Sequence, residues 1–206
     1  MKYGPDKWDK RYSIDEYVYG KEPNLFLNEN FKVIPMGNVL CVADGEGRNS
    51  VWLAKLGYNV TSIDFSPKAI EKTLKLAGEN RVVVNTVCAD LLNYDFGNNK
   101  YEGIVSIFSH FKLEDTKSLH QKYYNALKPG GVFLMEAFAK EQLPLNTGGP
   151  KNIDLLYNIE DIRNSFPRGK IEMLKKDVVY LYEGDLHDGK AVVIRAIIKN
   201  PSEKEN

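Results

Sequence analysis

Apolar and polar positions alternate along this chain in blocks that predict strands and helices in turn. A mostly apolar run at 39–43 predicts a buried strand, and residues 50–56 behind it have helical spacing. Four further strands are expected in the first two thirds of the chain, at 58–63, 82–87, 103–108 and 132–135. Helices are expected between them, because Ser66-Pro67 is a helix start and apolar residues recur at helical spacing up to Ala77 and again from Leu113 to Leu127. This alternation indicates an α/β fold with a parallel sheet covered by helices on both faces.

The two ends of the chain depart from this alternation. Residues 1–31 mix aromatic and charged positions without a strand pattern, and a helix is expected after Glu22-Pro23-Asn24. This leader either covers a ligand site or packs on the outside of the core. Near the other end, a short helix at 158–166 is followed by strands at 177–183 and 191–198, with Asp188-Gly189 as a turn signal. An antiparallel pair at one edge of the sheet is therefore expected.

The chain has neither repeats nor an interior linker, so we expect one domain over residues 1–206. Within it, 1–31 is interpreted as a helical lid segment, 32–199 as a doubly wound, Rossmann-like core, and 200–206 as a flexible polar tail. A length of 206 residues suits one sizeable core.

Composition excludes several classes of function. Lys plus Arg and Asp plus Glu each total 28, and this balance argues against sequence-independent nucleic-acid binding and a polybasic membrane anchor. Apolar runs are too short to span a bilayer, and residues 1–11 lack the apolar stretch of a signal peptide. We therefore expect a cytoplasmic protein that binds neither membrane nor nucleic acid, as a monomer or weak homodimer.

Cysteine and histidine usage gives no sign of a metal site. Cys41 and Cys88 lie in apolar stretches and are interpreted as reduced core residues. The three histidines are scattered, so no structural zinc site is expected. Of these, His120 and His187 are interpreted as surface residues.

Polar residues follow each of the first four predicted strands. Asp44 and Glu46 follow the first strand, Asp64 the second and Asp90 the third, while Ser109-His110 follows the fourth. Ligands of open α/β sheets bind at these carboxyl ends. Asp64 lies 17 positions (64 − 47) after Gly47, near the interval at which an acid reaches a ribose diol. The pattern predicts a nucleoside ligand, with Asp64 on the ribose and Asp90 on the adenine amino group.

The acidic turn distinguishes between nucleoside cofactors. A nicotinamide dinucleotide places its pyrophosphate at a glycine-rich turn, where the carboxylates of Asp44 and Glu46 would repel it. The full three-glycine spacing is also absent. Carboxylates at this position favour a cationic ligand that carries an ammonium and a sulfonium group.

At these residues the chain resembles class I S-adenosylmethionine-dependent methyltransferases over nearly its whole length. The segments that carry the resemblance are Val39 to Gly47, Ile63-Asp64, Ala89-Asp90-Leu91, Ile104 to Phe108 and Leu127-Lys128-Pro129-Gly130-Gly131. The form Gly-Glu-Gly-Arg-Asn at 45–49, with Trp8-Asp9-Lys10-Arg11-Tyr12 upstream, is similar to the tellurite-resistance and thiopurine methyltransferase-like branch. The resemblance implies a seven-stranded, mostly parallel sheet whose last strand is antiparallel.

The resemblance also implies a set of S-adenosylmethionine-binding residues. These are Tyr19, Asp44, Gly45, Glu46, Gly47, Arg48, Asp64, Phe65, Ala89, Asp90, Leu91 and Phe108. Two positions depart from the family pattern, since Cys41 stands where an acid is usual and Ala43 where a glycine is usual. We expect Asp44 to replace the missing acid toward the cofactor's ammonium. For Arg48 we expect a salt bridge, either to an acid or to the cofactor's carboxylate. Tyr19 is expected to close over the methionine.

The predicted activity is methyl transfer to a small-molecule acceptor, and the branch resemblance points to a soft thiol, selenium or tellurium nucleophile. His110 follows the fourth strand and is the candidate that orients or deprotonates the acceptor, the other reading being a structural histidine. The loop 146–150 either lines the acceptor pocket or turns the chain. Two other functions stay open: a nucleotide-dependent oxidoreductase, and a cofactor-binding module without catalysis.

Overall fold

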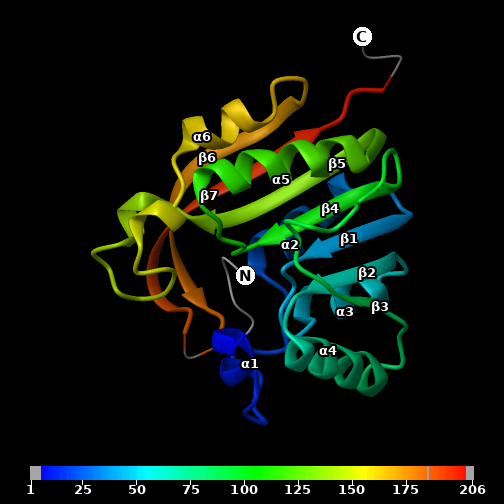
Figure 1. Cartoon of the computed structure of the whole chain (residues 1–206), viewed down its shortest axis with the longest axis vertical. Coiled ribbons are helices and arrows are strands. Elements are labelled where there is room, and N and C mark those ends of the chain that lie inside the picture. Colours follow the sequence, from blue (N-terminus) through cyan, green and yellow to red (C-terminus); the bar gives the residue numbers. More distant parts are fainter. Residues whose placement is uncertain (1–5, 185, 203–206) are drawn as a thin grey trace.

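The computed structural model, which describes residues 6–184 and 186–202, has one seven-stranded sheet in the order β3-β2-β1-β4-β5-β7-β6 (Figure 1). The strands are β1 (Asn38–Val42), β2 (Asn59–Asp64), β3 (Asn85–Cys88), β4 (Tyr101–Ile107), β5 (Leu127–Phe138), β6 (Lys170–Tyr182) and β7 (Asp188–Lys199). The helices are α1 (Asp6–Tyr12), α2 (Leu25–Asn30), α3 (Arg48–Lys55), α4 (Pro67–Glu79), α5 (Leu113–Ala126) and α6 (Ile159–Ser165). Short 3₁₀ turns lie at Phe31–Val33, Lys140–Gln142 and Ile153–Leu155.

The direction of the strands confirms the predicted fold class. β3, β2, β1, β4 and β5 pair in parallel, whereas β7 is antiparallel to both β5 and β6. The chain leaves β1 for β2 on one side and returns to β4 on the other, so the topological switch point lies between β1 and β4. The carboxyl ends of these two strands are where a ligand is expected.

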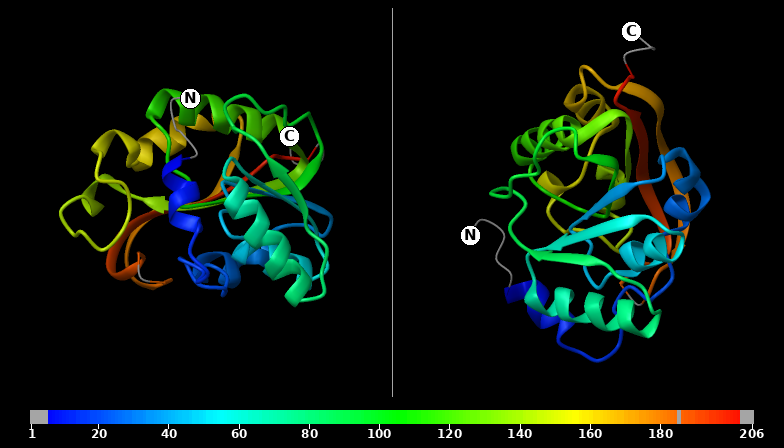
Figure 2. Two further views of the ribbon diagram at one scale, coloured as in Figure 1. Left: turned by 60° about the horizontal axis from the view of Figure 1, so that its bottom comes forward. Right: turned by 90° about the vertical axis from the view of Figure 1, so that its right-hand side faces the viewer.

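Alternation along the strands divides the core into two halves. Leu40 and Val42 of β1 pack toward α5 and α6, whereas Val39 and Cys41 pack toward α2, α3 and α4. Successive side chains of a strand point to opposite faces, and a strand that is apolar on both faces must be covered twice. Figure 2 shows the two helical layers on either side of the sheet.

Helix α4 shows how the local sequence sets its ends. The hydroxyl of Ser66 accepts from the backbone N–H of Ala69, and Pro67 occupies the first turn, as predicted. At the other end, Arg81 takes a left-handed φ of 58°, and the N–H of Val82 donates to Ala77. This ending uses residues that were predicted to begin the third strand, so β3 starts at Asn85 instead of Val82.

The N-terminal segment lies across the carboxyl ends of the strands. Figures 1 and 2 show α1 beside α4, at the edge toward which β1 and β4 point. The carboxylate of Asp9 accepts from the hydroxyl of Ser66 and, at 3.4 Å, from the N–H of Lys68, which ties α1 to the start of α4.

At the other end of the chain, Asn200 bonds with Gly130 and Gly131. Residues 1–5 of the predicted lid and 203–206 of the predicted tail lie outside the described residues. Among the described residues, no helix is both long and apolar enough to cross a bilayer.

Candidate active site

The turn between β1 and α3 is built from left-handed backbone. Ala43, Gly45 and Gly47 have φ angles of 49°, 63° and 86°, a region that disfavours residues with a Cβ. A Cβ on Gly47 would lie 2.7 Å from Cγ2 of Thr73, and one on Gly45 would lie 3.0 Å from the hydroxyl of Tyr12. Both glycines therefore let the turn fit closely between α4 and the N-terminal segment. Ala43 adopts the same backbone region with a side chain, at a cost of about 1 kcal/mol.

Asp64 at the end of β2 faces this turn. Its two carboxylate oxygens accept from the N–H groups of Gly45 and Ser66, each at 2.9 Å. The side chain is buried, and burial raises the pKa of Asp64 to about 6 even though the two backbone donors act in the opposite direction. A buried carboxylate with a raised pKa gains from any further donor, and ribose hydroxyls are such donors.

Asp44 points toward the protein interior. One of its oxygens accepts from the hydroxyls of Ser50, at 2.5 Å, and Ser62, at 2.8 Å. Burial raises the pKa of Asp44, and the two hydroxyl bonds oppose that rise. The neighbouring Cys41 is buried in the core, as predicted. The contacts of Asp44 thus join the turn to α3 and β2, and they are the partners that the structure gives to this acid.

Glu46 fastens the N-terminal segment to the turn. Its carboxylate accepts from the N–H of Val18 at 2.9 Å and lies 2.5 Å from the ammonium group of Lys72. The same ammonium donates to the carbonyls of Ile14, at 2.9 Å, and Glu16, at 2.6 Å. A buried charge is stable only when an opposite charge lies beside it and its polar atoms have hydrogen-bond partners. The contacts that join Glu46, Lys72 and the backbone of residues 14–18, which we call the latch, supply both. Glu46 therefore holds the covering segment in place.

Tyr12 is the part of that segment which meets the glycine turn. Its side chain is 5% exposed, and its hydroxyl is the nearest atom to the space above Gly45. Burial, followed by the charge of Asp64, raises the pKa of Tyr12 well above its usual value. Tyr12 therefore packs directly on the predicted cofactor turn.

Arg48 forms a buried salt bridge with Glu183, at 2.7 Å, so the structure gives the first of the two predicted partners, an acid. The side-chain amide of Asn24 donates to Glu183 at 2.9 Å and to Glu136 at 2.7 Å, and Arg195 lies 2.5 Å from Glu136. Burial alone would raise the pKa of Glu183, but His187 and Arg48 together lower it to about 2. These residues join the start of α3 to the β6–β7 hairpin.

Four aromatic rings, from Tyr19, Phe108, Phe138 and His187, meet beyond the ends of β4 and β5, and we call them the aromatic cluster. The ring of His187 lies 4.6 Å from Tyr19, 4.5 Å from Phe108 and 5.2 Å from Phe138. Phe108 stacks on Phe138 at 4.6 Å, and the hydroxyl of Tyr19 accepts from Arg11 at 2.7 Å. Tyr19 and Phe108, two predicted cofactor residues, are therefore brought together with two residues that were not predicted.

The third predicted motif, at the end of β3, is stabilised by local bonds. One oxygen of Asp90 accepts from the N–H of Leu92 and the other from the side chain of Asn93, both at 3.0 Å. The N–H of Ala89 donates to the carbonyl of Asp64 at 3.0 Å, and Leu91 is buried. Both carboxylate oxygens of Asp90 therefore stabilise the turn after β3, which lies next to the end of β2.

Phe65 follows Asp64 directly, and its carbonyl lies 3.7 Å from the sulfur of Cys88. Cys88 itself is exposed, so its prediction as a core residue was wrong. It lies at the end of β3, the edge strand of the sheet, where one side has no neighbouring strand to cover it.

The ring of His110 is held by backbone groups on both nitrogens. Nδ1 lies 2.8 Å from the carbonyl of Leu155, and Nε2 accepts from the N–H of Phe138 at 3.4 Å. Burial lowers the pKa of His110 to about 4. A base must have a nitrogen free for the acceptor's proton, and the two backbone contacts of His110 fill both positions. The geometry supports the structural reading of His110.

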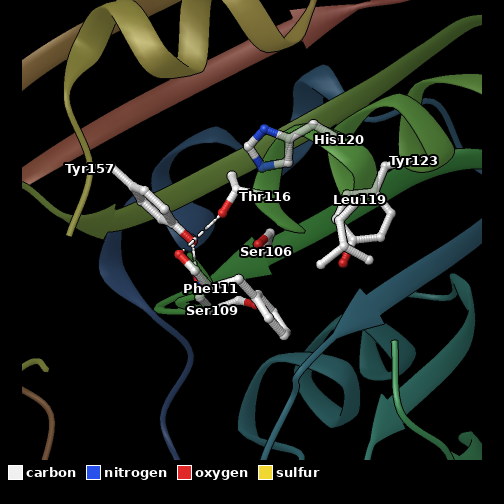
Figure 3. Close-up of a pocket in the computed structure, with 8 residues that line it drawn as sticks. All are labelled: Ser106, Ser109, Phe111, Thr116, Leu119, His120, Tyr123 and Tyr157. Atoms are coloured by element: carbon white, nitrogen blue, oxygen red, sulfur yellow. Dashed lines mark hydrogen bonds between the residues drawn. The ribbon is translucent and has the colours of Figure 1, made fainter. Parts of the chain in front are cut away.

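Behind the loop that carries His110, a cavity of about 10 Å³ lies between the end of β4 and α5 (Figure 3). The hydroxyl of Tyr157 accepts from the N–H of Phe111 at 2.9 Å, donates to the carbonyl of Ser109 at 3.0 Å, and lies 3.2 Å from Thr116. This space is large enough for one water molecule and no more. The cavity therefore stabilises the loop after β4 and has no room for a substrate.

Both remaining histidines were predicted at the surface, and both predictions were wrong. His120 is 4% exposed because the inward face of α5 packs it against Phe133 and Phe166. His187 is 6% exposed because the hairpin that carries it folds back over the aromatic cluster. A histidine in a turn-rich segment gives no local sign of such long-range packing, so the sequence pattern could not identify His187.

Residues 39–131 match the family described as a methyltransferase domain. The glycine/sarcosine N-methyltransferase of Parasynechococcus marenigrum is 28% identical over 137 residues, which cover 64% of this chain and 48% of that protein. The chain spans about half the length of the glycine/sarcosine and phosphoethanolamine N-methyltransferases that it matches.

Two solved structures share the fold over most of this chain. The N-methyltransferase NodS from Bradyrhizobium japonicum, in complex with S-adenosyl-L-homocysteine, aligns with a TM-score of 0.72 and 14% identity, over 96% of this chain and 98% of that one. TehB from Haemophilus influenzae aligns with a TM-score of 0.71 and 18% identity, over 95% of this chain and 66% of that one.

Proposed function

We propose that this chain is a class I S-adenosylmethionine-dependent methyltransferase that transfers the cofactor's methyl group to a small-molecule acceptor. Its match to the methyltransferase-domain family over residues 39–131 supports the reaction type. The observation that carries the proposal is the pair of carboxylates at the carboxyl ends of β1 and β2. Asp64 and Asp44 lie beside a left-handed glycine turn, with Asp64 buried against backbone donors. These carboxylates can accept from the hydroxyls of a nucleoside and favour one that carries positive charge, and they would repel a pyrophosphate.

In this proposal Asp64 accepts from the ribose hydroxyls, and Asp90 with Leu91 borders the adenine. Gly45, Glu46 and Gly47 enclose the methionine part from the turn. Tyr12 and Tyr19 cover the ligand from the N-terminal segment, which the latch between Glu46 and Lys72 holds in place. The remaining predicted residues, Asp44, Arg48, Phe65, Ala89 and Phe108, shape the walls through the contacts described above.

The bound cofactor supplies an activated methyl group, and the chain's residues supply alignment and exclusion of water. The aromatic cluster lies at the carboxyl ends of β4 and β5 and includes two predicted cofactor residues, Tyr19 and Phe108. We therefore assign it to the acceptor side of the site. Its apolar rings exclude water around the reacting atoms, and the loop that includes Gly148 packs on the same rings.

The acceptor class has two candidates. The curated relatives are named for N-methylation of glycine, sarcosine and phosphoethanolamine, which are amines. The resemblance of Gly-Glu-Gly-Arg-Asn at 45–49 to the tellurite-resistance branch keeps a soft thiol, selenium or tellurium acceptor as the second candidate. An oxidoreductase is disfavoured because the carboxylates that suit a cation disfavour a dinucleotide.

The test uses S-adenosylmethionine labelled in the methyl group and a panel of glycine, sarcosine, phosphoethanolamine, thiols, selenite and tellurite. We expect label in at least one acceptor class, together with calorimetric binding of S-adenosylmethionine. Binding of the cofactor without transfer to any member would support the non-catalytic module. Binding of a nicotinamide dinucleotide but not of S-adenosylmethionine would reject the proposal.

A further inference from the structure

His187 combines burial, an acidic partner and a position in the aromatic cluster. It lies at the end of the β6–β7 turn, where its Nδ1 faces a carboxylate oxygen of Glu183 at 3.7 Å. Nδ1 is buried and forms no hydrogen bond within the described part of the chain. Three aromatic rings, from Tyr19, Phe108 and Phe138, surround the imidazole at 4.5–5.2 Å.

Segments from distant parts of the chain pack around this imidazole. A Cβ on Gly184 would lie 2.2 Å from the carbonyl of Val18, so the hairpin meets the N-terminal segment without room for a side chain. A Cβ on Gly148 would lie 3.2 Å from Cδ2 of His187. The N-terminal segment, the β6–β7 hairpin and the 146–149 loop therefore cover the ends of β4 and β5 together, and we call this covering layer the roof. His187 is a buried polar residue within it.

Glu183 determines the protonation pattern of the ring. Its carboxylate is held by Arg48 at 2.7 Å and by Asn24 at 2.9 Å, so it stays in place and ionised. A carboxylate that faces Nδ1 favours the tautomer with the proton on Nδ1, which leaves the lone pair on Nε2. In this tautomer the imidazole is a base at Nε2.

We propose that His187 is a catalytic residue of this site, the base that takes a proton from an acceptor whose nucleophilic nitrogen or sulfur carries one. This inference rests on the proposed function and names its acceptor class: an amine or a thiol. As the new bond forms between the nucleophile and the methyl carbon, the bond from that carbon to the sulfonium sulfur breaks. The nucleophile's proton passes to Nε2, and the resulting imidazolium is paired with Glu183.

The charged groups around His187 agree with this role. Burial lowers the pKa of His187; Glu183 acts in the opposite direction, while Arg48 and Arg11 lower it further. Tyr19 faces it from the N-terminal segment, and the groups from β4 and β5 are the uncharged rings of Phe108 and Phe138. The ring is therefore neutral before the reaction, and it gains a compensating carboxylate when it takes the proton.

The first test compares the wild-type protein with His187→Asn and His187→Gln. Transfer to the amine or thiol acceptor found in the panel is followed at saturating cofactor from pH 5 to pH 8. We expect kcat to fall about 100-fold or more in both variants, with little change in the dissociation constant of S-adenosylmethionine. We also expect wild-type kcat to rise with pH to a plateau near neutrality, and the variants to lose this rise. The matched control is His120→Asn, another buried histidine, which keeps the wild-type pH profile.

The second test does not depend on turnover or on the variants' folding. In the wild-type protein labelled with ¹⁵N-histidine, without cofactor, we expect His187 to be neutral at pH 7 with the proton on Nδ1. An Nε2-protonated tautomer would overturn the proposal, and so would variants that keep kcat within threefold. If S-adenosylmethionine does not bind the wild-type protein at all, the proposed function fails instead, which calorimetry shows separately.

Discussion

Cofactor binding should depend on pH through a single carboxyl group, Asp64. Burial raises the pKa of Asp64 to about 6 in the free protein, whereas the proposed ribose contact requires the ionised form, because only the carboxylate accepts from both hydroxyls. With that pKa, about 9% of the carboxyl is ionised at pH 5 and about 91% at pH 7. The affinity for S-adenosylmethionine should therefore be about tenfold lower at pH 5, a difference of about 1.4 kcal/mol.

Calorimetry at pH 5, 6 and 7 measures this dependence, and this range lies below the ordinary pKa of the cofactor's amino group. Asp64→Asn should bind more weakly at pH 7, by about 10- to 100-fold, because the amide accepts only at one atom. Its affinity should also be nearly the same at all three pH values. Glu79→Gln, at an exposed carboxylate of α4, should keep the wild-type dependence. A wild-type affinity that varies by less than twofold would refute the assignment of Asp64 to the ribose.

The raised pKa of Asp64 also predicts how the stability of the protein changes with pH. Since the folded pKa of Asp64, about 6, lies above the unfolded value, the folded state holds more protons between pH 4 and pH 6. The free energy of unfolding should therefore fall as the pH rises through this window, by about 3 kcal/mol from this group. Asp64→Asn should remove that decrease in urea titrations, and a decrease of unchanged size would contradict the raised pKa.

Three further substitutions test the surroundings of the site. Arg48→Met should lower the free energy of unfolding by about 3–5 kcal/mol in urea, because it leaves Glu183 as an unpaired buried charge; a loss under 1 kcal/mol would contradict this. Since the pKa of Glu183 is lowered to about 2, its contribution to stability should be present above pH 4 and lost as the pH falls toward 2. Gly47→Ala should cost about 1–3 kcal/mol in the same assay, because a Cβ there meets α4 at a φ of 86°; a neutral effect would contradict it. Lys72→Met should speed proteolytic cleavage within residues 13–20 and weaken cofactor binding, while Lys68→Met, whose ion pair is exposed, should do neither.

The fold could be predicted largely from the sequence because its signals are local. The apolar run before Asp44 gave β1, and Ser66-Pro67 gave the start of α4, since a cap and a first-turn proline act over a few residues. The late start of β3 also has a local origin: Arg81 and Val82 complete the end of α4 in place of starting a strand. Valines in that position satisfy a strand pattern and a helix ending equally well. The strands β5 and β6 begin earlier than predicted, at Leu127 and Lys170 in place of 132 and 177.

The site could be predicted only in part, because much of it depends on contacts across the whole chain. Asp64 was predicted to bind the ribose because strand ends in a parallel sheet share one edge, and the structure places its carboxylate beside the glycine turn. Arg48 pairs with an acid in the β6–β7 hairpin, and Glu46 pairs with a lysine on α4. Neither pairing could be predicted from the spacing of these residues along the sequence. His110 follows a strand end as a catalytic residue would, yet the backbone groups that occupy its nitrogens come from Phe138 and Leu155.

The roof over the site has a consequence for the order in which the protein becomes functional. Asn24 and Glu183, which bond across it, are 159 positions apart, and Arg48 and Glu183 are 135 apart. Contacts of such long range form only after the chain between them has been ordered. During synthesis, the glycine turn and β1 emerge well before the hairpin that carries Glu183 and His187. A nascent chain that already has β1 to β5 therefore still lacks part of the proposed acceptor side, and the hairpin completes it only after β6 and β7 have joined the sheet.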